Sequence, residues 1–287
     1  MGQAQTGSLT SKAMLVRLNI SQWEGRKFDK KATKEVEAAH HTIGNAGRFN
    51  KILIAESAIR KITNINGKSR EFHYLNSRPW RDDGARILPS ANFLSYTKGM
   101  QEFKEQYRES VEELITNYEG LVEEAKTRLN TLYNAADYPS AQCVKNKHAF
   151  SVSFDPIPEA GDFRVELSNE AVEEIKKEIT DRNNVAFREA NKDLWVRLHT
   201  SIKHMVDKLT TTDARIFESM LGNIADLCSL LPRLNFEDDK ELDRIRLEVE
   251  KKLCSYTTDD LRTDRVVRAN AAKEAKEILE DITKFMS

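Results

Sequence analysis

The sequence predicts a mainly α protein of the α+β class, an elongated antiparallel helical bundle with two very long helices and a small β-hairpin or sheet at one end. Charged residues make up 32% of the 287 residues, with only 11 Gly and 6 Pro to interrupt helices. Ordinary globular chains carry about 25% charged residues. Apolar residues recur every three or four positions through two long stretches, which is the helical period. A short segment of alternating apolar and polar residues separates these stretches and predicts the sheet.

The first long helix begins at Phe93, after a turn-rich segment. Its apolar stripe predicts one helix of about 40 residues, or roughly 60 Å at 1.5 Å per residue. Since such a helix far exceeds the usual length of about 11 or 12 residues, we expect it to pack along an equally long partner. The stripe comprises Phe93, Tyr96, Met100, Phe103, Tyr107, Val111, Leu114, Tyr118, Leu121, Ala125, Leu129 and Leu132.

The expected partner is a second long helix over residues 169–209, with Ser168 as its N-cap. Its stripe weakens at residues 181–184, where we expect a bend. A β-hairpin is predicted between the two helices, because apolar residues alternate with polar ones through 150–154 and again through 163–167. The connection DPIPEAGD is too long for a two-residue turn.

Shorter elements complete the chain. We predict a strand over residues 14–20, a helix from the N-cap Asp29 to about Thr42, and short helical pieces to about Ile65, where NGK marks a turn. Three further helices are expected near 213–231, 238–253 and 259–285. Capping-box spacing supports two of them, through Asp238 with Glu241 and Thr257 with Asp260.

The predicted organisation has four parts in chain order. Residues 1–13 form a flexible tail and residues 14–92 a basic region of strand and short helices. Residues 93–211 form a long-helix hairpin with the β-hairpin inserted at 148–167, and residues 212–287 form C-terminal helices.

Charge is unevenly distributed along the chain. Residues 1–110 hold 19 Lys/Arg and 11 Asp/Glu, whereas residues 111–287 hold 26 and 35. A basic half and an acidic half attract each other within one molecule or between copies, so we expect a homo-oligomer. The basic half could instead face nucleic acid.

The cysteines and the hydropathy indicate a cytoplasmic protein. Cys143, Cys228 and Cys254 are widely spaced and form no CxxC pair, which argues against a disulfide framework or a zinc knuckle. No apolar run approaches the roughly 20 residues that cross a bilayer, so we expect no membrane association.

No motif of a known catalytic site is present. The sequence lacks GxSxG, GxGxxG and the P-loop. The spacing of His40 with His41, and of His199 with His204, does not suit a helical zinc pair. We therefore expect no enzymatic activity, metal or cofactor. A hydrolase or nuclease built on His73, Asp82 and Asp83 is the least favoured alternative, because an Asp pair is more typical of a turn.

Three basic stretches also contain aromatic residues and glycines: WEGRKF (23–28), GNAGRFNK (44–51) and SREFHYLNSRPWRDDGAR (69–86). Proteins hold single-stranded nucleic acid in this way, with cations along the phosphates and rings stacked on the bases. In the structural alternative, the aromatic residues Trp23, Phe28, Phe49, Phe72, Tyr74 and Trp80 anchor the loops in the core. The candidate residues for binding nucleic acid or another partner are Arg26, Lys27, Arg48, Lys51, Arg70, Arg78, Trp80, Arg81 and Arg86.

Residues 77–93, SRPWRDDGARILPSANF, form the most unusual segment. Pro79 and Pro89 bracket a rigid corner, Trp80 is expected to anchor it, and Gly84 to supply a backbone turn. Arg78, Arg81 and Arg86 are then expected to be free to contact a partner.

The same stretches carry a resemblance. WxGRKFD, GxAGRFNK and PWRDDGARILPSANFxxY resemble an uncharacterised family of helical proteins encoded by bacteriophages and integrative conjugative elements, over residues 14–210. The resemblance implies a mobile-element origin, the cytoplasm of a bacterial host cell, a DNA-handling setting and a possible partner in a MoxR/CobS-type AAA+ ATPase. It supplies no catalytic residue.

Two hypotheses about function therefore lead. The first is a non-enzymatic interaction or scaffold protein of a mobile element, an adaptor for the AAA+ ATPase that self-assembles. The second is an accessory protein that binds single-stranded DNA or another polyanion through the basic half during recombination or replication of the element.

Overall fold

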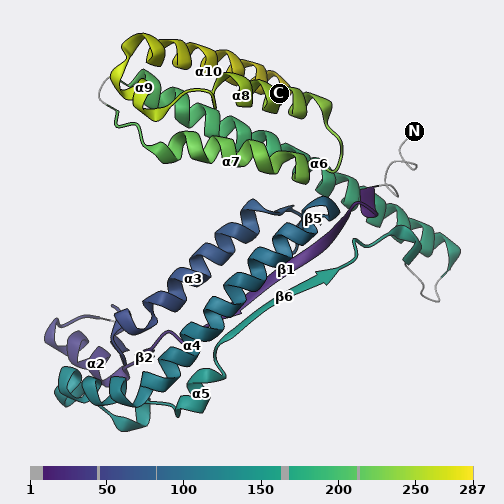
Figure 1. Ribbon diagram of the computed structural model, residues 1–287. Helices are drawn as coiled ribbons and strands as arrows, with labels where there is room; N and C mark the ends of the chain where they lie inside the picture. Colours follow the sequence, from purple (N-terminus) through teal and green to yellow (C-terminus); the bar gives the residue numbers. More distant parts are fainter. Residues whose placement is uncertain (1–8, 44–45, 82, 163–167, 212–213, 287) are drawn as a thin grey trace. The chain divides into compact units, whose positions relative to one another are not determined.

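The computed structural model describes residues 9–43, 46–81, 83–162, 168–211 and 214–286, and it is mainly helical with a small antiparallel sheet (Figure 1). The chain forms two compact units. Unit 1 contains Met1–Arg17, Tyr74–Tyr96 and Ser153–Ser287, and unit 2 contains Leu18–His73 and Thr97–Val152. Each unit is built from separate stretches of the chain, so neither unit is one continuous segment of the sequence.

A four-stranded sheet has the strand order β4-β5-β1-β6. The predicted strand at 14–20 is confirmed as β1, which pairs antiparallel with β5 so that Met14 lies opposite Leu88. Its burial does not alternate as expected, since adjacent Leu15 and Val16 are both buried. Both faces of the strand are therefore covered at this point. The strands are β1 (Ala13–Ser21), β4 (Arg78–Pro79), β5 (Arg86–Pro89) and β6 (Ala149–Asp155).

The predicted β-hairpin is only partly described. Its first strand exists as β6, but β6 joins the sheet beside β1. The second predicted strand, 163–167, lies outside the described residues. The 3-10 turn η4 (Ala160–Asp162) lies in the connection.

Unit 1 contains the second long helix, α6 (Asn169–Thr210). Ser168 caps it as predicted, because its side chain accepts a hydrogen bond from the Ala171 N–H. The helix runs through residues 181–184, where a bend was expected, and here Asn183 is buried and donates to the Pro158 carbonyl. The helices that follow are α7 (Glu218–Leu234), α8 (Lys240–Lys252), α9 (Thr258–Thr263) and α10 (Arg265–Met286).

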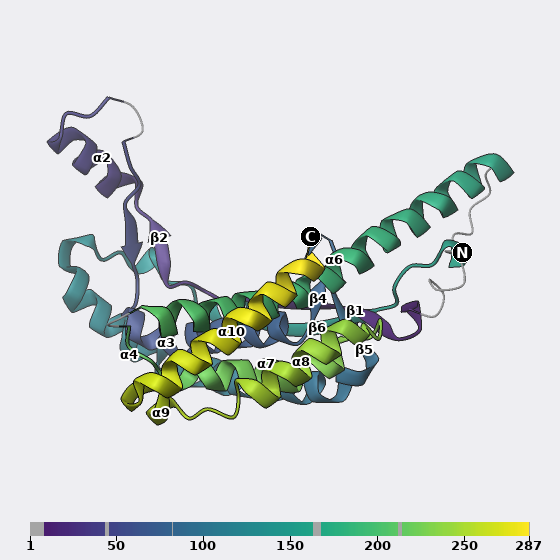
Figure 2. The ribbon, with the colours of Figure 1, turned by 90° about the horizontal axis from the view of Figure 1, so that it is seen from above.

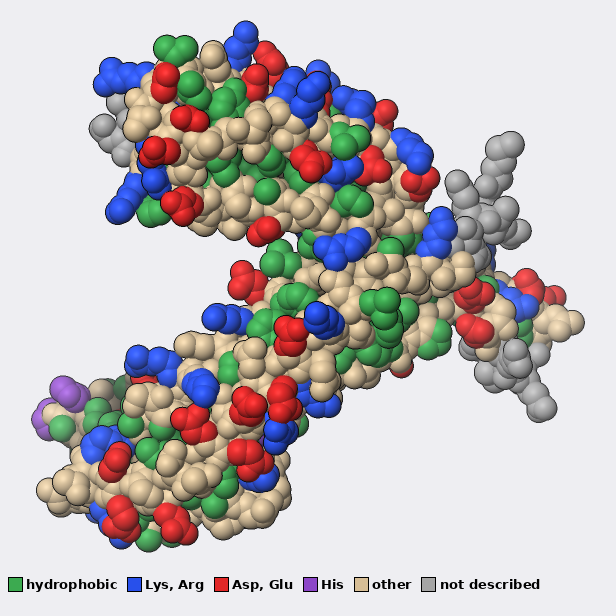
Figure 3. Space-filling model, viewed as in Figure 1, with side chains coloured by type: hydrophobic (Ala, Val, Ile, Leu, Met, Phe, Trp, Pro, Cys, Tyr) green, Lys and Arg blue, Asp and Glu red, His purple; other side chains and the backbone are tan. Residues whose placement is uncertain are grey.

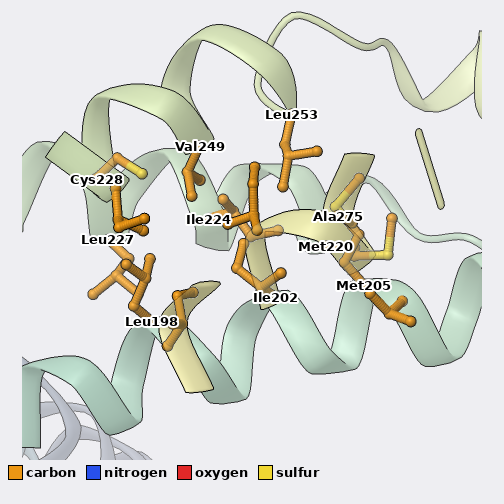
Figure 4. Packing of buried hydrophobic residues seen from close by; sticks show 14 of the residues in the cluster. Leu198, Ile202, Met205, Met220, Ile224, Leu227, Cys228, Val249, Leu253 and Ala275 are labelled. Atoms are coloured by element: carbon orange, nitrogen blue, oxygen red, sulfur yellow. The ribbon is translucent and has the colours of Figure 1, made fainter. Parts of the chain in front are cut away.

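Helices α7, α8 and α10 cover the apolar face of the second half of α6. Figure 4 shows side chains from these four helices pointing toward one another, among them Leu198, Ile202 and Ile224. Each such side chain contributes about 1.5–3 kcal/mol when fully buried. The predicted packing of this stripe along the first long helix is not confirmed, since helices of its own unit cover its second half.

Two helix boundaries differ from the predicted ones. The N-cap of α8 is Asp239, whose side chain accepts from two backbone N–H groups, whereas Asp238 takes a positive φ of 60° just before it. The helix predicted over 259–285 is divided in two, since Asp264 accepts hydrogen bonds from the N–H groups of Val266 and Val267 and so starts α10. Thr257 caps α9 as predicted.

Unit 2 contains most of the first long helix, α4 (Phe93–Leu129). Its predicted stripe is buried at Tyr107, Leu114 and Tyr118. The ring of Tyr107 lies 5.6 Å from that of Phe150, and the ring of Tyr118 lies 5.7 Å from that of Trp23. The other elements are β2 (Arg26–Phe28), α2 (Lys30–Ala39), β3 (Asn50–Ile52), α3 (Glu56–Leu75), α5 (Ala141–Lys145) and the 3-10 turns η1 (Ser90–Asn92), η2 (Asn130–Leu132) and η3 (Ala135–Asp137).

The turn predicted at NGK, residues 66–68, is absent from the described structure of this segment. Helix α3 instead runs through it without interruption. Asn66 is buried and donates a hydrogen bond to Gln22, which stabilises the helical conformation here. Gly67 costs about 1 kcal/mol relative to alanine, and tertiary contacts along the 20-residue helix offset this.

None of the described helices is long and apolar enough to cross a bilayer.

The three thiols are expected to react at different rates. Cys143 is exposed, Cys254 is half-buried, and Cys228 is buried in the core of unit 1. A hydrogen bond to Cys254, together with burial, raises the pKa of Cys228, and the same hydrogen bond lowers the pKa of Cys254. With a thiol-specific disulfide reagent, we expect Cys143 and Cys254 to react in the native protein and Cys228 only after unfolding. Mass spectrometry of the labelled peptides checks this, and early labelling of Cys228 would contradict it.

Candidate binding surface

The structure divides the nine sequence-predicted binding residues into two sets and one isolated residue. Arg70 is exposed on α3 and belongs to neither set. The first set surrounds the β4–β5 hairpin in unit 1, and the second surrounds the two-stranded sheet β2–β3 in unit 2. These sets are Arg78, Trp80, Arg81 and Arg86, and Arg26, Lys27, Arg48 and Lys51, respectively.

Arg78 is a structural residue inside unit 1. Its side chain is fully buried, and its guanidinium donates from Nε to the Ala190 carbonyl at 2.9 Å and from Nη1 to the Leu234 carbonyl at 3.0 Å. The guanidinium also lies 4.7 Å from the centre of the Phe236 ring. Burial lowers the pKa of Arg78 to about 10, against the opposing effect of Glu237. The expectation that Arg78 is free to contact a partner is therefore wrong.

Arg86 is also held within unit 1. It donates from Nε to the Ser77 hydroxyl at 2.7 Å and from Nη2 to the Ser77 carbonyl at 3.0 Å. Its guanidinium lies 4.9 Å from the centre of the Tyr74 ring. These contacts fix the connection between α3 and β4, and they correct the expectation that Arg86 is free.

Trp80 anchors the hairpin, as the structural alternative predicted. The ring is buried and packs 5.9 Å from Phe187 of α6. Arg81 is exposed, lies over the Trp80 ring at 4.6 Å and donates to the Asn183 side chain. Of the hairpin residues in this set, Arg81 alone is exposed. It lines a groove of about 740 Å³ along α6 that also includes Val185.

The tip of this hairpin is a turn. Gly84 has a φ of +80°, which confirms the predicted backbone turn. Asp83 accepts a hydrogen bond from the Ala85 N–H and pairs with Arg17 at 3.1 Å. These contacts lower the pKa of Asp83, the Ala85 N–H most strongly. Asp82 lies outside the described residues.

The second set lies on a small lobe of unit 2, which we define as residues 26–52 without 44 and 45. Figure 2 shows its helix α2 projecting away from the long helices α3 and α4 of the same unit, with strand β2 leading to it. Strands β2 and β3 pair antiparallel, with Lys27 opposite Lys51. Asp29 follows β2 directly and caps α2 by accepting from the N–H groups of Lys31 and Ala32. The predicted helix start at Asp29 is thus confirmed.

A buried ionic cluster holds the lobe together. The side chain of Lys51 is only 3% exposed, and its ammonium pairs with Asp29 at 3.0 Å and also with Asp137 of η3. It further donates to the Leu132 carbonyl at 2.9 Å. Lys27 approaches the same Asp137 carboxylate at 2.8 Å but is half-exposed. Lys51 is therefore a structural cation, not a surface contact as the sequence suggested.

The remaining cations of this set face outward. Arg26 is exposed and pairs with Glu56 at 2.7 Å. Arg48 is exposed, and its guanidinium lies over the Phe28 ring at 4.6 Å. Both Phe28 and Phe49 remain more than a third exposed, so neither is the core anchor of the structural alternative. Figure 3 shows Lys/Arg, His and apolar side chains side by side on the visible face of the lobe.

A hollow of about 470 Å³ opens between α2 and the segment before β3. Thr33, Val36 and Glu37 of α2 and its C-cap His40 line it, and these positions share one helical face. The residues contributed by the other wall are Thr42, Ala46, Gly47, Arg48 and Phe49.

Sequence reasoning did not find the hollow, although a signal exists. Val36 is 51% exposed and Ile43 is fully exposed, so two large apolar side chains lie on the surface within one short stretch. The i, i+3, i+7 spacing of Thr33, Val36 and His40 predicts one helical face. Arg48 and Phe49 come close to that face because β3 pairs antiparallel with β2, and this pairing is not visible in the sequence pattern.

Within the described ranges, no group of three or more His, Cys, Asp or Glu side chains is arranged to hold a metal ion. The fold and these surfaces define a mainly helical α+β protein with a small basic and apolar lobe. Comparison with protein families, curated proteins and solved structures found no match to this chain.

Proposed function

We propose that the protein is a non-enzymatic interaction protein that binds another macromolecule through the lobe of unit 2. The observation that carries the proposal is the hollow beside α2, which combines exposed apolar side chains with outward-facing cations. Contiguous apolar surface is rarely exposed without a binding role, because covering it from water is favourable.

The buried cluster around Lys51 supports the same proposal. It fixes α2 against β3 and η3, so the walls of the hollow are formed in the unbound protein. A preformed site binds more tightly, because less conformational entropy is lost on binding. The mobile-element setting, the AAA+ ATPase partner and self-assembly belong to this proposal as expectations that rest on the resemblance and on the charge distribution.

Replacing Val36 by glutamate is expected to remove partner binding without unfolding the protein. The side chain is half-exposed, so a charge there is tolerated in the free state but is desolvated in a complex. The measurement is a pull-down with the tagged full-length chain from host cells, with and without nuclease, read by quantitative mass spectrometry. We expect at least about a tenfold loss of the specific partner, equivalent to about 1.4 kcal/mol.

Val185→Glu is the matched control, since Val185 is 50% exposed but lies on the α6 groove of unit 1. If Val185→Glu retains partner binding and Val36→Glu loses it, the binding surface lies on the lobe. The reverse pattern would place the binding surface on the groove beside Arg81 and contradict the proposal.

Binding of single-stranded nucleic acid is the second candidate function. It is favoured by the Arg48 guanidinium over the Phe28 ring and by the exposed parts of the Phe28 and Phe49 rings. Base stacking on such rings contributes about 1–3 kcal/mol per base. If this function is correct, nuclease treatment should remove the partners recovered in the pull-down. The affinity for an oligonucleotide should also fall steeply as the salt concentration rises.

A further inference from the structure

We propose that the hollow of the lobe binds an acidic segment of a partner protein, which inserts large apolar side chains and sets its carboxylates against Arg48 and the lysines of α2. This inference rests on the proposed function and specifies the chemistry of the partner.

The shape and lining of the hollow suit apolar side chains. Its volume of about 470 Å³ falls within the roughly 300–1,000 Å³ of small-ligand pockets. The walls offer the Val36 side chain and the Phe49 ring, which are 51% and 37% exposed. Burying both side chains in a complex would remove apolar surface from water and so stabilise the complex. Helix-binding grooves take anchors spaced three or four residues apart in this way.

The charge around the hollow is positive. Residues 26–51 contain seven Lys/Arg and three Asp/Glu. One of these carboxylates, Asp29, already neutralises the buried Lys51. In the part of the chain that the structure describes, Lys30, Lys34 and Arg48 have no ion pair within 4 Å. Arg48 lines the hollow, and Lys30 and Lys34 each lie three residues before a lining residue of α2, so they are neighbours of the lining on the helix surface. These cations complement a segment in which carboxylates flank apolar side chains.

Phosphate chains fit this surface less well than an acidic protein segment. The Glu37 side chain lines the hollow, and its carboxylate would repel the phosphates of a polyanion there. A peptide can instead place aliphatic side chains or a backbone N–H there. Val36 presents an aliphatic surface, whereas bases stack best on the faces of aromatic side chains.

The test is fluorescence anisotropy with the full-length chain and labelled peptides of about 20 residues, a length that forms a stable helix more readily than shorter ones. The probe peptide carries Leu and Phe three and four residues apart with Glu and Asp between them. One control peptide replaces the acidic residues by Lys, and another replaces Leu and Phe by Ser. A labelled oligo(dT) is the nucleic-acid probe.

We expect binding of the acidic amphipathic peptide alone, weakened at least about tenfold by Val36→Glu and by Arg48→Glu, and unchanged by Val185→Glu. Circular dichroism of each variant shows whether it is folded. Equal binding of the Lys peptide or the Ser peptide, or binding that is insensitive to both lobe variants, would overturn the inference.

Three other outcomes also overturn it and identify the alternative. Binding of oligo(dT) but of no peptide supports the nucleic-acid function. Self-association that Val36→Glu abolishes in light scattering makes a second copy of the chain the occupant. If no peptide binds but the pull-down partner is still lost on Val36→Glu, the proposed function stands and the acidic segment is rejected. If the pull-down partner is also unaffected by Val36→Glu, the proposed function and the acidic segment are both rejected.

Discussion

Replacing Arg78 by alanine is expected to destabilise unit 1 by about 3–5 kcal/mol, which is the cost of two charge-assisted hydrogen bonds and a buried cavity. The guanidinium joins three elements, because β4 supplies the arginine, α6 the Ala190 carbonyl and α7 the Leu234 carbonyl. Leu234 is the last residue of α7, where carbonyl groups have no partner within the helix. Thermal unfolding measures the loss of stability, and hydrogen exchange should show lost protection in β4, α6 and α7.

Two further variants sharpen this prediction. Arg78→Met fills much of the volume without donors, so its smaller cost separates the cavity from the hydrogen bonds. Arg188→Ala is the control, because Arg188 is exposed on the same helix α6 and should change stability by less than about 0.5 kcal/mol. Equal stability of the Arg78→Ala and Arg188→Ala variants would show that the buried guanidinium contributes nothing to the fold.

Replacing Lys51 by methionine is expected to unfold the lobe locally, at a cost of about 3–5 kcal/mol. The variant leaves the mostly buried carboxylates of Asp29 and Asp137 without their shared cation, and breaking one side of a buried ion pair costs about this much. Hydrogen exchange should rise in α2, β2 and β3. Lys27→Met is the matched control. Lys27 lies opposite Lys51 and contacts the same Asp137 but is 49% exposed, so we expect a loss of at most about 1 kcal/mol.

The effect of Lys51→Met depends on pH in a defined direction. The Ala32 N–H and Lys51 lower the pKa of Asp29, and the hydrogen bonds from Lys27 and Lys51 lower that of Asp137 despite the opposing effect of burial. Burial alone would lower the pKa of Lys51, but the hydrogen bonds that its ammonium donates to the Asp137 and Asp29 carboxylates raise it. The carboxylates contribute stability that is complete above their usual pKa of 3.8 and is lost as pH falls through their lowered pKa.

Lys51 contributes stability that is complete below its usual pKa of 10.5 and is lost as pH rises through its raised pKa. The difference in stability between wild type and Lys51→Met should therefore be constant between these values and shrink at both extremes. Chemical unfolding at several pH values measures it. A difference that grows in acid would contradict the assigned ion pairs.

The sequence by itself determined the elements that depend on local patterns. The stripe from Phe93 specified α4, because one apolar face at the helical period can be buried only in a helix. The caps Asp29 and Ser168 specified the starts of α2 and α6, since an N-cap satisfies N–H groups two or three residues away. The corner around Trp80 was also predictable, because a tryptophan beside prolines and a glycine is typical of a buried turn.

Only the tertiary structure decided how the basic residues are used. Arg78, Lys51 and Arg48 all lie in the basic stretches that also contain aromatic residues, yet Arg78 and Lys51 are buried and Arg48 is exposed. Their partners lie far along the chain, at Ala190, Leu234 and Asp137. A hydrogen bond or ion pair between distant residues leaves no periodic trace in the sequence. The hollow beside α2 has the same origin, because its two walls meet only when β3 returns along β2.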